Sequence, residues 1–127
     1  MDITKEQFIA GLLKIRDKGK FNGTKFLSLL KAQYYSDKHT ITATRLAEAA
    51  DYANFNAANL HYGTLGHFLA DAIGYQPPKR KNGESIWFWT LSTGNDASEN
   101  TIDGHYEFVM RPELVAALQE MKWVKVK

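Results

Sequence analysis

The 127-residue chain contains no cysteine, and its apolar residues form no long uninterrupted run. The absence of cysteine excludes disulfides and thiolate sites, and it suits a reducing compartment such as the bacterial cytoplasm. A membrane-spanning helix needs about 20 predominantly apolar residues, and the N-terminus lacks the apolar core of a signal peptide. We therefore expect a cytoplasmic protein with no membrane partner.

Sequence motifs that carry catalysis are also missing. The chain has no HExxH pair, no phosphate-cradling glycine loop and no nucleophile elbow. His61 and His67 are predicted to fall on different faces of one helix, and no acidic residue stands at metal-ligand spacing from both. The remaining histidines, His39 and His105, are isolated. We expect a non-enzymatic protein with no metal and no cofactor, and only the scattered histidines favour a small hydrolase instead.

Charge is divided unevenly along the chain. In total, 16 Lys and Arg against 14 Asp and Glu give a net charge of +2. Residues 1–81 hold twelve Lys or Arg and seven Asp or Glu, a net of +5, whereas residues 82–127 hold four and seven, a net of −3. This division permits the first two-thirds of the chain to bind a polyanion. The length and the apolar content of 44% suit a single globular domain with its own core.

Helical periodicity and capping residues predict a helical part over residues 1–75. Apolar residues at helical spacing predict helices over residues 4–18 and 24–35. Thr42 is a natural N-cap for a short helix over residues 43–50, and Asn54 or Asn56 caps a longer helix that ends near Tyr75. Thr40 and Ile41 are expected to form a short extended piece before the short helix. A short helix, a tight turn and a longer helix are typical of a helix-turn-helix unit.

Residues 84–127 are predicted to form a β-hairpin and a closing helix. Ser85–Leu91 (SIWFWTL) and His105–Met110 (HYEFVM) have the aromatic and β-branched content of strands, and we expect them to pair. Pro112 suits the first turn of a helix that ends at Met121, and Trp123–Val126 alternates like a short third strand. The predicted fold is a single α+β domain over residues 1–127, of winged helix-turn-helix type.

The longer helix has an unusual polar face. At 100° per residue, its buried stripe consists of Ala58, Tyr62, Leu65, Leu69, Ala72 and Ile73. The opposite face carries Asn56, Leu60, Gly63, Thr64 and His67, with Asn59 and His61 on its shoulders. A face that only meets solvent is usually made of Lys and Glu, so this face is a candidate contact surface. Gly63 and Gly66 either let another backbone approach closely or only relieve crowding against neighbouring helices.

Duplex DNA is our leading hypothesis for the partner. Asn side chains pair with adenine edges, and three adjacent bases on the loop after the long helix can contact phosphates. An ordinary solubilising loop is the alternative for those bases. The predicted nucleic-acid-binding residues are Arg45, Asn54, Asn56, Asn59, Thr64, His67, Lys79, Arg80 and Lys81. A homodimer would match paired DNA half-sites, although the sequence shows no dimerisation stripe.

A protein-interaction module is the alternative function. Leu60 and Gly63 on the outer helix face favour it, as do Asp96, Glu99 and Asp103 in the connector of residues 92–104. Phosphate would repel this acidic connector, whereas an acidic loop can imitate phosphates inside a nucleic-acid channel. The connector lacks the spacing of a calcium loop, so we expect no metal there. The partner would then be a nuclease or a defence enzyme, and the chain an adaptor or a phage-encoded inhibitor.

Three segments of the chain are ITATRLAEAADYANFNAANLHYGTLG, IWFWTL and HYEFVMRPELVAALQEMKWV. Together they resemble a small bacterial domain that is found alone or near HNH-type restriction endonucleases, and the likeness covers roughly the last 90 residues. The matching residues are Ile41, Thr42, Ala43, Leu46, Ala47, Asn59, Tyr62, Gly63, Leu65, Gly66 and Arg111 to Leu114. The resemblance implies a winged-helix-like fold and a role in restriction or phage–host conflict. It implies no nuclease activity, because this chain has no HNH motif.

Overall fold

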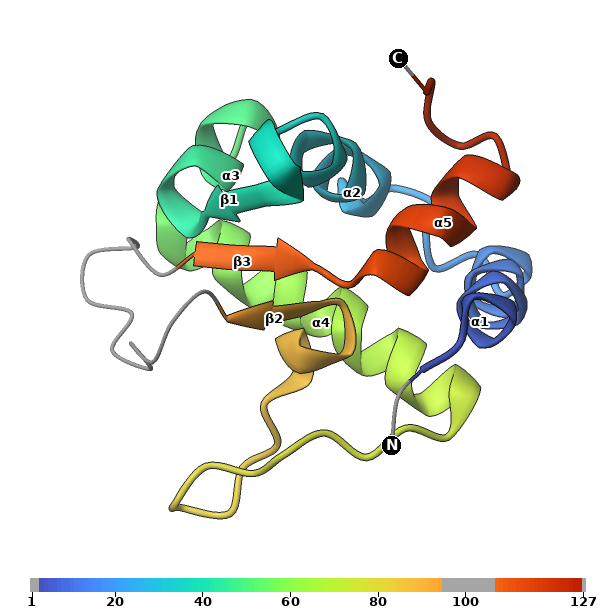
Figure 1. Ribbon diagram of the computed structural model, residues 1–127. Coiled ribbons are helices and arrows are strands. Elements are labelled where there is room, and N and C mark those ends of the chain that lie inside the picture. Colours follow the sequence, from blue (N-terminus) through green and yellow to red (C-terminus); the bar gives the residue numbers. More distant parts are fainter. Residues whose placement is uncertain (1–2, 95–106, 127) are drawn as a thin grey trace.

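The computed structural model of the chain describes residues 3–94 and 107–126. Within them the fold is α+β, with five α-helices, a three-stranded antiparallel sheet and two short 3-10 helices (Figure 1). No helix of this described part is long and apolar enough to cross a membrane. The elements in chain order are α1 (Lys5–Asp17), α2 (Phe26–Tyr34), η1 (Asp37–His39), β1 (Thr40–Thr42), α3 (Ala43–Ala49), α4 (Phe55–Ile73), η2 (Trp87–Thr90), β2 (Ser92–Gly94), β3 (Glu107–Met110) and α5 (Pro112–Glu120).

Side-chain caps fix the start of the two helices in the predicted helix-turn-helix unit. The Thr42 hydroxyl accepts a hydrogen bond from the backbone N–H of Arg45 at 3.2 Å, and α3 begins one residue later. The Asn54 side-chain oxygen accepts from the N–H of Ala57 at 2.9 Å, at the start of α4. Gly74 ends α4 in the left-handed conformation, with a φ of 74°. Thr42 and Asn54 are therefore confirmed as N-caps.

The sheet has β3 as its central strand. β3 pairs antiparallel with β1, where Ile41 stands opposite Phe108, and with β2, where Thr93 stands opposite Val109. The strand order is therefore β1-β3-β2. β1 confirms the short extended piece predicted at Thr40 and Ile41. Residues 95–106, which connect β2 to β3, lie outside the described part of the chain.

The predicted strand over residues 85–91 is wrong. Trp87–Thr90 form η2, and the strand that pairs with β3 begins only at Ser92. The backbone of η2 lies directly on α4: a Cβ added to Gly66 would come within 2.3 Å of the Trp87 carbonyl oxygen. Arg111 also donates to the Trp89 carbonyl oxygen from Nε at 3.0 Å and from Nη2 at 2.7 Å. These tertiary contacts outweigh the β propensity of the aromatic residues.

The predicted third strand at Trp123–Val126 is also wrong. Lys122 has a φ of 59°, and the N–H of Trp123 donates to the carbonyl oxygen of Leu118 at 3.1 Å, so the chain turns back at the end of α5. The Trp123 ring then packs edge-on against Phe21, with 5.4 Å between ring centroids. The third strand of the sheet is β1, which pairs with the edge of β3 opposite to β2.

α4 lies behind the sheet in the view of Figure 1 and packs against α1 and α3. Leu46, Ala47 and Leu65 are buried in the core. Gly11 marks the close approach of α1 to the end of α4, since a Cβ there would lie 2.5 Å from Cγ2 of Ile73. α4 is therefore held rigidly on its inner side, which fixes the direction of its outer face.

A buried polar network ties α4 to the sheet. The Tyr62 hydroxyl donates to the side-chain oxygen of Gln33 at 2.6 Å and also contacts the Ser92 hydroxyl. The Gln33 amide donates to the Ser92 hydroxyl at 2.9 Å and to the Phe108 carbonyl oxygen at 3.1 Å. Burial raises the pKa of the Tyr62 hydroxyl above its usual value, and the hydrogen bonds to Ser92 and Gln33 partly oppose this shift. The network thus joins α2, α4, β2 and β3 through neutral groups.

Candidate functional site

The first half of α4 presents the candidate surface. Ala58, Tyr62, Leu65 and Leu69 are fully buried, so the inner side of the helix follows the predicted stripe. On the outer side Asn56 is exposed, and the Leu60 side chain is 68% exposed. A Cβ added to Gly63 would meet no atom within 4 Å, so the surface beside Leu60 is open. This half of the helix is free to contact a partner.

Part of the second half of the outer face is occupied by the chain itself, although the His67 side chain stays 46% exposed. The His67 ring stacks on the Trp87 ring, with 3.7 Å between centroids and 7° between planes. Nε2 of His67 also lies 3.4 Å from a carboxylate oxygen of Asp71. The two glycines of α4 therefore differ in their surroundings. Gly66 allows the backbone of η2 to approach the helix closely, whereas Gly63 faces open space. The DNA contact of His67 stays a prediction, and its stacking on Trp87 is a tertiary contact that helical periodicity could not reveal.

A groove separates the outer face of α4 from the segment that follows it. Its volume is about 250 Å³. The groove is lined by Asn59, Leu60, Gly63, Thr64, His67, Arg80, Glu84, Ser85, Trp87 and Phe88. It brings together four residues predicted to bind nucleic acid, Asn59, Thr64, His67 and Arg80, with the two α4 residues predicted to contact protein. The two rival predictions therefore concern one surface.

Two of the residues predicted to bind nucleic acid already make hydrogen bonds within the protein. The Thr64 hydroxyl donates to the carbonyl oxygen of Leu60 at 2.9 Å, so its hydrogen is occupied within the helix. The Asn54 side-chain oxygen is occupied as the cap of α4. The Thr64 hydroxyl can therefore still accept a hydrogen bond from a ligand, and the Asn54 amide nitrogen can still donate one.

The basic loop before η2 is ordered by its own backbone. Lys79 and Ser85 form an isolated antiparallel β-bridge, and the N–H of Arg80 donates to the Glu84 carbonyl oxygen at 2.7 Å. Gly83, with a φ of 90°, makes the turn that the Asn-Gly pair predicts. Lys79, Arg80 and Lys81 are all exposed, as is the acidic Glu84. With three bases and one acid, the loop presents a net charge of +2 beside α4.

Arg45 does not line the groove and lies on α3, the helix that precedes α4. It is exposed on α3, which packs against α4. The turn between these helices is closed by Tyr52, whose N–H donates to the Ala47 carbonyl oxygen at 2.8 Å, and by the ammonium of Lys25, which donates to the Asp51 carbonyl oxygen. Asp51 has a φ of 60° there. Arg45 is therefore held in a fixed position relative to α4.

The acidic residues of the rival hypothesis, Asp96, Glu99 and Asp103, lie outside the described residues, as does His105. Among the residues that are described, no group of three or more His, Asp or Glu side chains is placed to hold a metal ion. His61 contacts the Tyr52 hydroxyl through Nδ1 at 3.1 Å. His61 and His67 are thus engaged with different neighbours.

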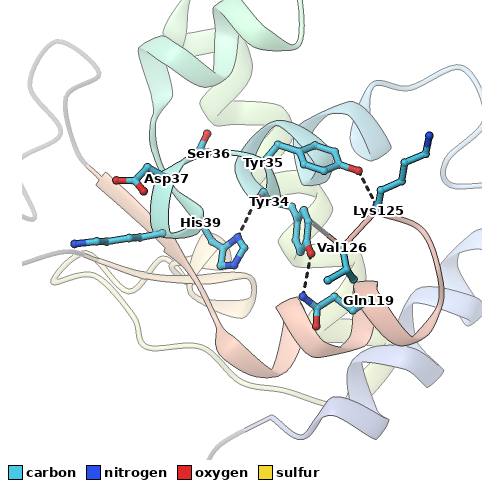
Figure 2. Close-up of a pocket in the computed structure, with 9 residues that line it drawn as sticks. Tyr34, Tyr35, Ser36, Asp37, His39, Gln119, Lys125 and Val126 are labelled. Carbon is cyan, nitrogen blue, oxygen red and sulfur yellow. Dashed lines mark hydrogen bonds between the residues drawn. The ribbon is translucent and has the colours of Figure 1, made fainter.

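A second pocket, of about 340 Å³, was not predicted from the sequence. It forms between the continuous segment from the end of α2 to η1 and the C-terminal part of the chain, which lies far away in the sequence (Figure 2). Nδ1 of His39 donates to the Tyr34 carbonyl oxygen at 2.6 Å, because a carbonyl can only accept. Gln119 donates to the Tyr34 hydroxyl at 2.9 Å, and the backbone N–H of Lys125 donates to the Tyr35 hydroxyl at 2.8 Å.

The two tyrosine hydroxyls of this second pocket are bonded to groups that also line it, and these bonds hold α5 and the C-terminal segment on α2. Figure 2 shows both tyrosine hydroxyls directed at these internal partners. The α4 groove differs, because it lies beside the exposed Leu60 and is lined by the half-buried Asn59 and by the exposed Arg80 and Glu84 of the basic loop. It is therefore the better candidate for a functional site.

Comparisons of the chain with models of known protein families, with curated proteins and with solved structures found no match. The resemblance to a bacterial domain found near HNH-type endonucleases therefore stays a prediction. A function is proposed from the geometry of α4 and its surroundings.

Proposed function

We propose that this protein is a non-enzymatic, winged helix-turn-helix protein that binds duplex DNA. The observation that carries the proposal is the outer face of the first half of α4, which bears the exposed Asn56 and the half-buried Asn59 and has no carboxylate before Asp71. The element order β1-α3-α4-β2-β3 and the strand order β1-β3-β2 support the winged-helix part of the proposal. In a helix-turn-helix unit the second helix reads the major groove, and that helix is α4 here.

The polar groups of this region suit two kinds of contact with DNA, one to base edges and one to phosphates. The major groove admits an α-helix, and an Asn amide can pair with both the N6 and N7 positions of adenine. The first turn of α4 has no acidic residue, so the positive end of the helix dipole is free to approach phosphate. Arg45, Lys79, Arg80 and Lys81 would contact phosphates, which sets position and affinity without specifying sequence.

The proposal also implies a cellular compartment, a role beside a nuclease and an oligomeric state for the protein. Bacterial and phage genomes lie in the cytoplasm, so the protein would act there. In restriction or phage–host conflict it would serve as a reader of DNA, with cleavage left to a separate nuclease. Dimerisation would allow two copies of α4 to meet successive major grooves.

A titration of ¹⁵N-labelled protein with random-sequence duplex DNA at low salt tests the proposal. The backbone amides of Asn56, Asn59, Leu60 and Gly63 are expected to shift, together with those of residues 79–81. The amides of α2 serve as the internal control, because α2 lies on the opposite side of the molecule from the loop after α4 (Figure 1). An absence of shifts, or shifts confined to α2, would overturn the proposal.

The alternative function is a protein-interaction module that uses the same groove. The exposed Leu60 side chain and the acidic Glu84 in the groove wall favour this alternative. Pull-down from cells of the native host, with wild-type protein and with Leu60→Asp as bait, distinguishes it. The alternative predicts a nuclease or defence enzyme that the wild type captures and the variant loses. Recovery of no protein partner would count against it.

A further inference from the structure

We infer that Leu60 reads the 5-methyl group of a pyrimidine, carried by thymine or by 5-methylcytosine, in the major groove. The inference rests on the proposed function, because it assigns a specificity-determining role within the DNA contact of α4. It also reverses the first interpretation of Leu60, which counted this residue as evidence for a protein partner.

Leu60 is the most exposed large apolar side chain in the described part of the chain. Its exposed fraction is 68%, compared with 43% for Tyr35 and 39% for Leu27 on α2. A leucine that stays in water contributes little to folding, so its apolar surface remains available for burial on binding. Val126, 64% exposed, belongs to the C-terminal segment and is not part of the α4 surface.

The neighbours of Leu60 are suited to base edges. Asn56 stands one turn earlier on the same face, and Asn59 lines the groove beside Leu60. One turn later, Gly63 leaves the space next to Leu60 unfilled, since a Cβ there would meet nothing within 4 Å. A bulky planar edge can therefore approach the Leu60 side chain from the Gly63 side. No carboxylate on α4 before Asp71 would repel the phosphates that accompany such an edge.

An A·T pair offers the combination that these side chains match. Thymine places an apolar methyl group in the major groove, and its partner adenine presents N6 and N7 to an amide. A G·C pair carries no methyl group unless the cytosine is methylated. The choice of DNA over a protein surface rests on the amides of Asn56 and Asn59 and on the exposed bases of the loop after α4, which match base edges and phosphates.

The test compares methylated and unmethylated versions of one duplex. The best-bound sequence is first selected from a random duplex pool by the wild-type protein. It is then synthesised with thymine, with uracil in place of thymine, and with 5-methylcytosine in place of cytosine. Affinities of wild type, Leu60→Ala and the control Leu27→Ala are measured at one salt concentration. Leu27 is the matched control because it is a partly exposed leucine on α2.

We expect uracil to weaken wild-type binding by about fourfold per contacted methyl, the change that corresponds to about 0.8 kcal/mol for one buried methyl-sized group. Leu60→Ala should bind the thymine and uracil duplexes equally, whereas Leu27→Ala should discriminate as the wild type does. A gain on 5-methylcytosine without a loss on uracil would assign the methyl group to methylcytosine.

Three results would overturn the inference, and they separate it from the proposed function. Equal wild-type affinity for all three duplexes would remove methyl reading while leaving DNA binding intact. Discrimination that persists in Leu60→Ala would assign the reading to another residue. Failure of the wild type to bind any duplex would remove the proposed function and the inference together.

Discussion

The Tyr62 hydroxyl connects the helix that carries the candidate interface to the sheet. It donates to Gln33 and contacts Ser92, and all three side chains are fully buried. A buried polar group that loses its partner retains its desolvation cost, which is larger than the net gain from an average hydrogen bond. Tyr62 is therefore a residue at which a single oxygen atom affects the stability of the whole fold.

Replacement of Tyr62 by Phe is expected to lower the free energy of unfolding by about 1–3 kcal/mol. The phenyl ring still stacks on Phe108, where the centroids are 4.9 Å apart, but the Gln33 side-chain oxygen loses its donor. Urea unfolding at neutral pH measures the change. Tyr52→Phe is the matched control and should cost much less, because Tyr52 is only partly buried. Equal costs for the two variants would contradict the assigned network.

The comparison of wild type with Tyr62→Phe also gives a pH dependence of the unfolding free energy. Burial raises the pKa of Tyr62 in the folded protein, whereas the unfolded chain ionises near the ordinary value of 10.0. The neutral form is thus favoured by folding, and its contribution is complete below pH 10 and is lost as the pH rises further. Wild type should lose about 1.4 kcal/mol per pH unit relative to Tyr62→Phe above pH 10. A constant difference between the two proteins would contradict this assignment.

At the scale of elements, the contact between α4 and η2 shapes one border of the candidate groove. Gly66 makes this contact possible, because the Trp87 carbonyl oxygen occupies the place of a Cβ. Gly63 lies on the same helix but faces open space. Two glycines of one helix therefore allow a comparison in which helix propensity is matched and only the tertiary contact differs.

Gly66→Ala is expected to destabilise the protein by about 1–3 kcal/mol, since the backbone of η2 must move to accept the methyl group. Gly63→Ala should stabilise it by about 0.5–1 kcal/mol, because alanine is the better helix former and meets no neighbour. Thermal unfolding of both variants measures the difference. Stabilisation by Gly66→Ala would contradict the packing of η2 on α4.

The elements differ in how far their sequences predict them. The five helices were predictable because their signals are local, as in the Thr42 and Asn54 caps and the Gly74 stop. The segment of residues 85–91 was predicted as a strand because its aromatic residues have high β propensity. Its actual form depends on Gly66 and Arg111, which lie far away in the sequence and leave no local signal.

The candidate site shows the same limit. Helical periodicity identified the outer face of α4 and the exposure of Asn56 and Leu60. It could not show that His67 is stacked on Trp87, or that the Thr64 hydroxyl donates a hydrogen bond to the backbone of its own helix. Those facts come from tertiary packing and from a local bond that competes with ligand contacts. The periodicity of one helix cannot reveal what another segment places on it.

At the scale of the whole molecule, charge is concentrated rather than large. The net charge is only +2, yet the loop after α4 carries three exposed bases, of which Arg80 lines the groove that also holds Asn59 of the helix. A protein that neutralises phosphates releases condensed counterions, so its affinity falls as salt rises. The proposal of DNA binding therefore makes a quantitative prediction about salt that depends on where the bases lie.

Fluorescence anisotropy of random-sequence duplex DNA at two salt concentrations tests this central proposal most directly. Wild type should bind at low salt and weaken as salt rises. Replacement of Lys79, Arg80 and Lys81 by Ala should reduce the slope of log affinity against log salt by about three. The control removes three exposed lysines elsewhere, Lys14, Lys31 and Lys125, and should leave most of the slope. No binding by the wild type at low salt would contradict the proposal, and equal slopes for wild type and the loop variant would remove the loop from it.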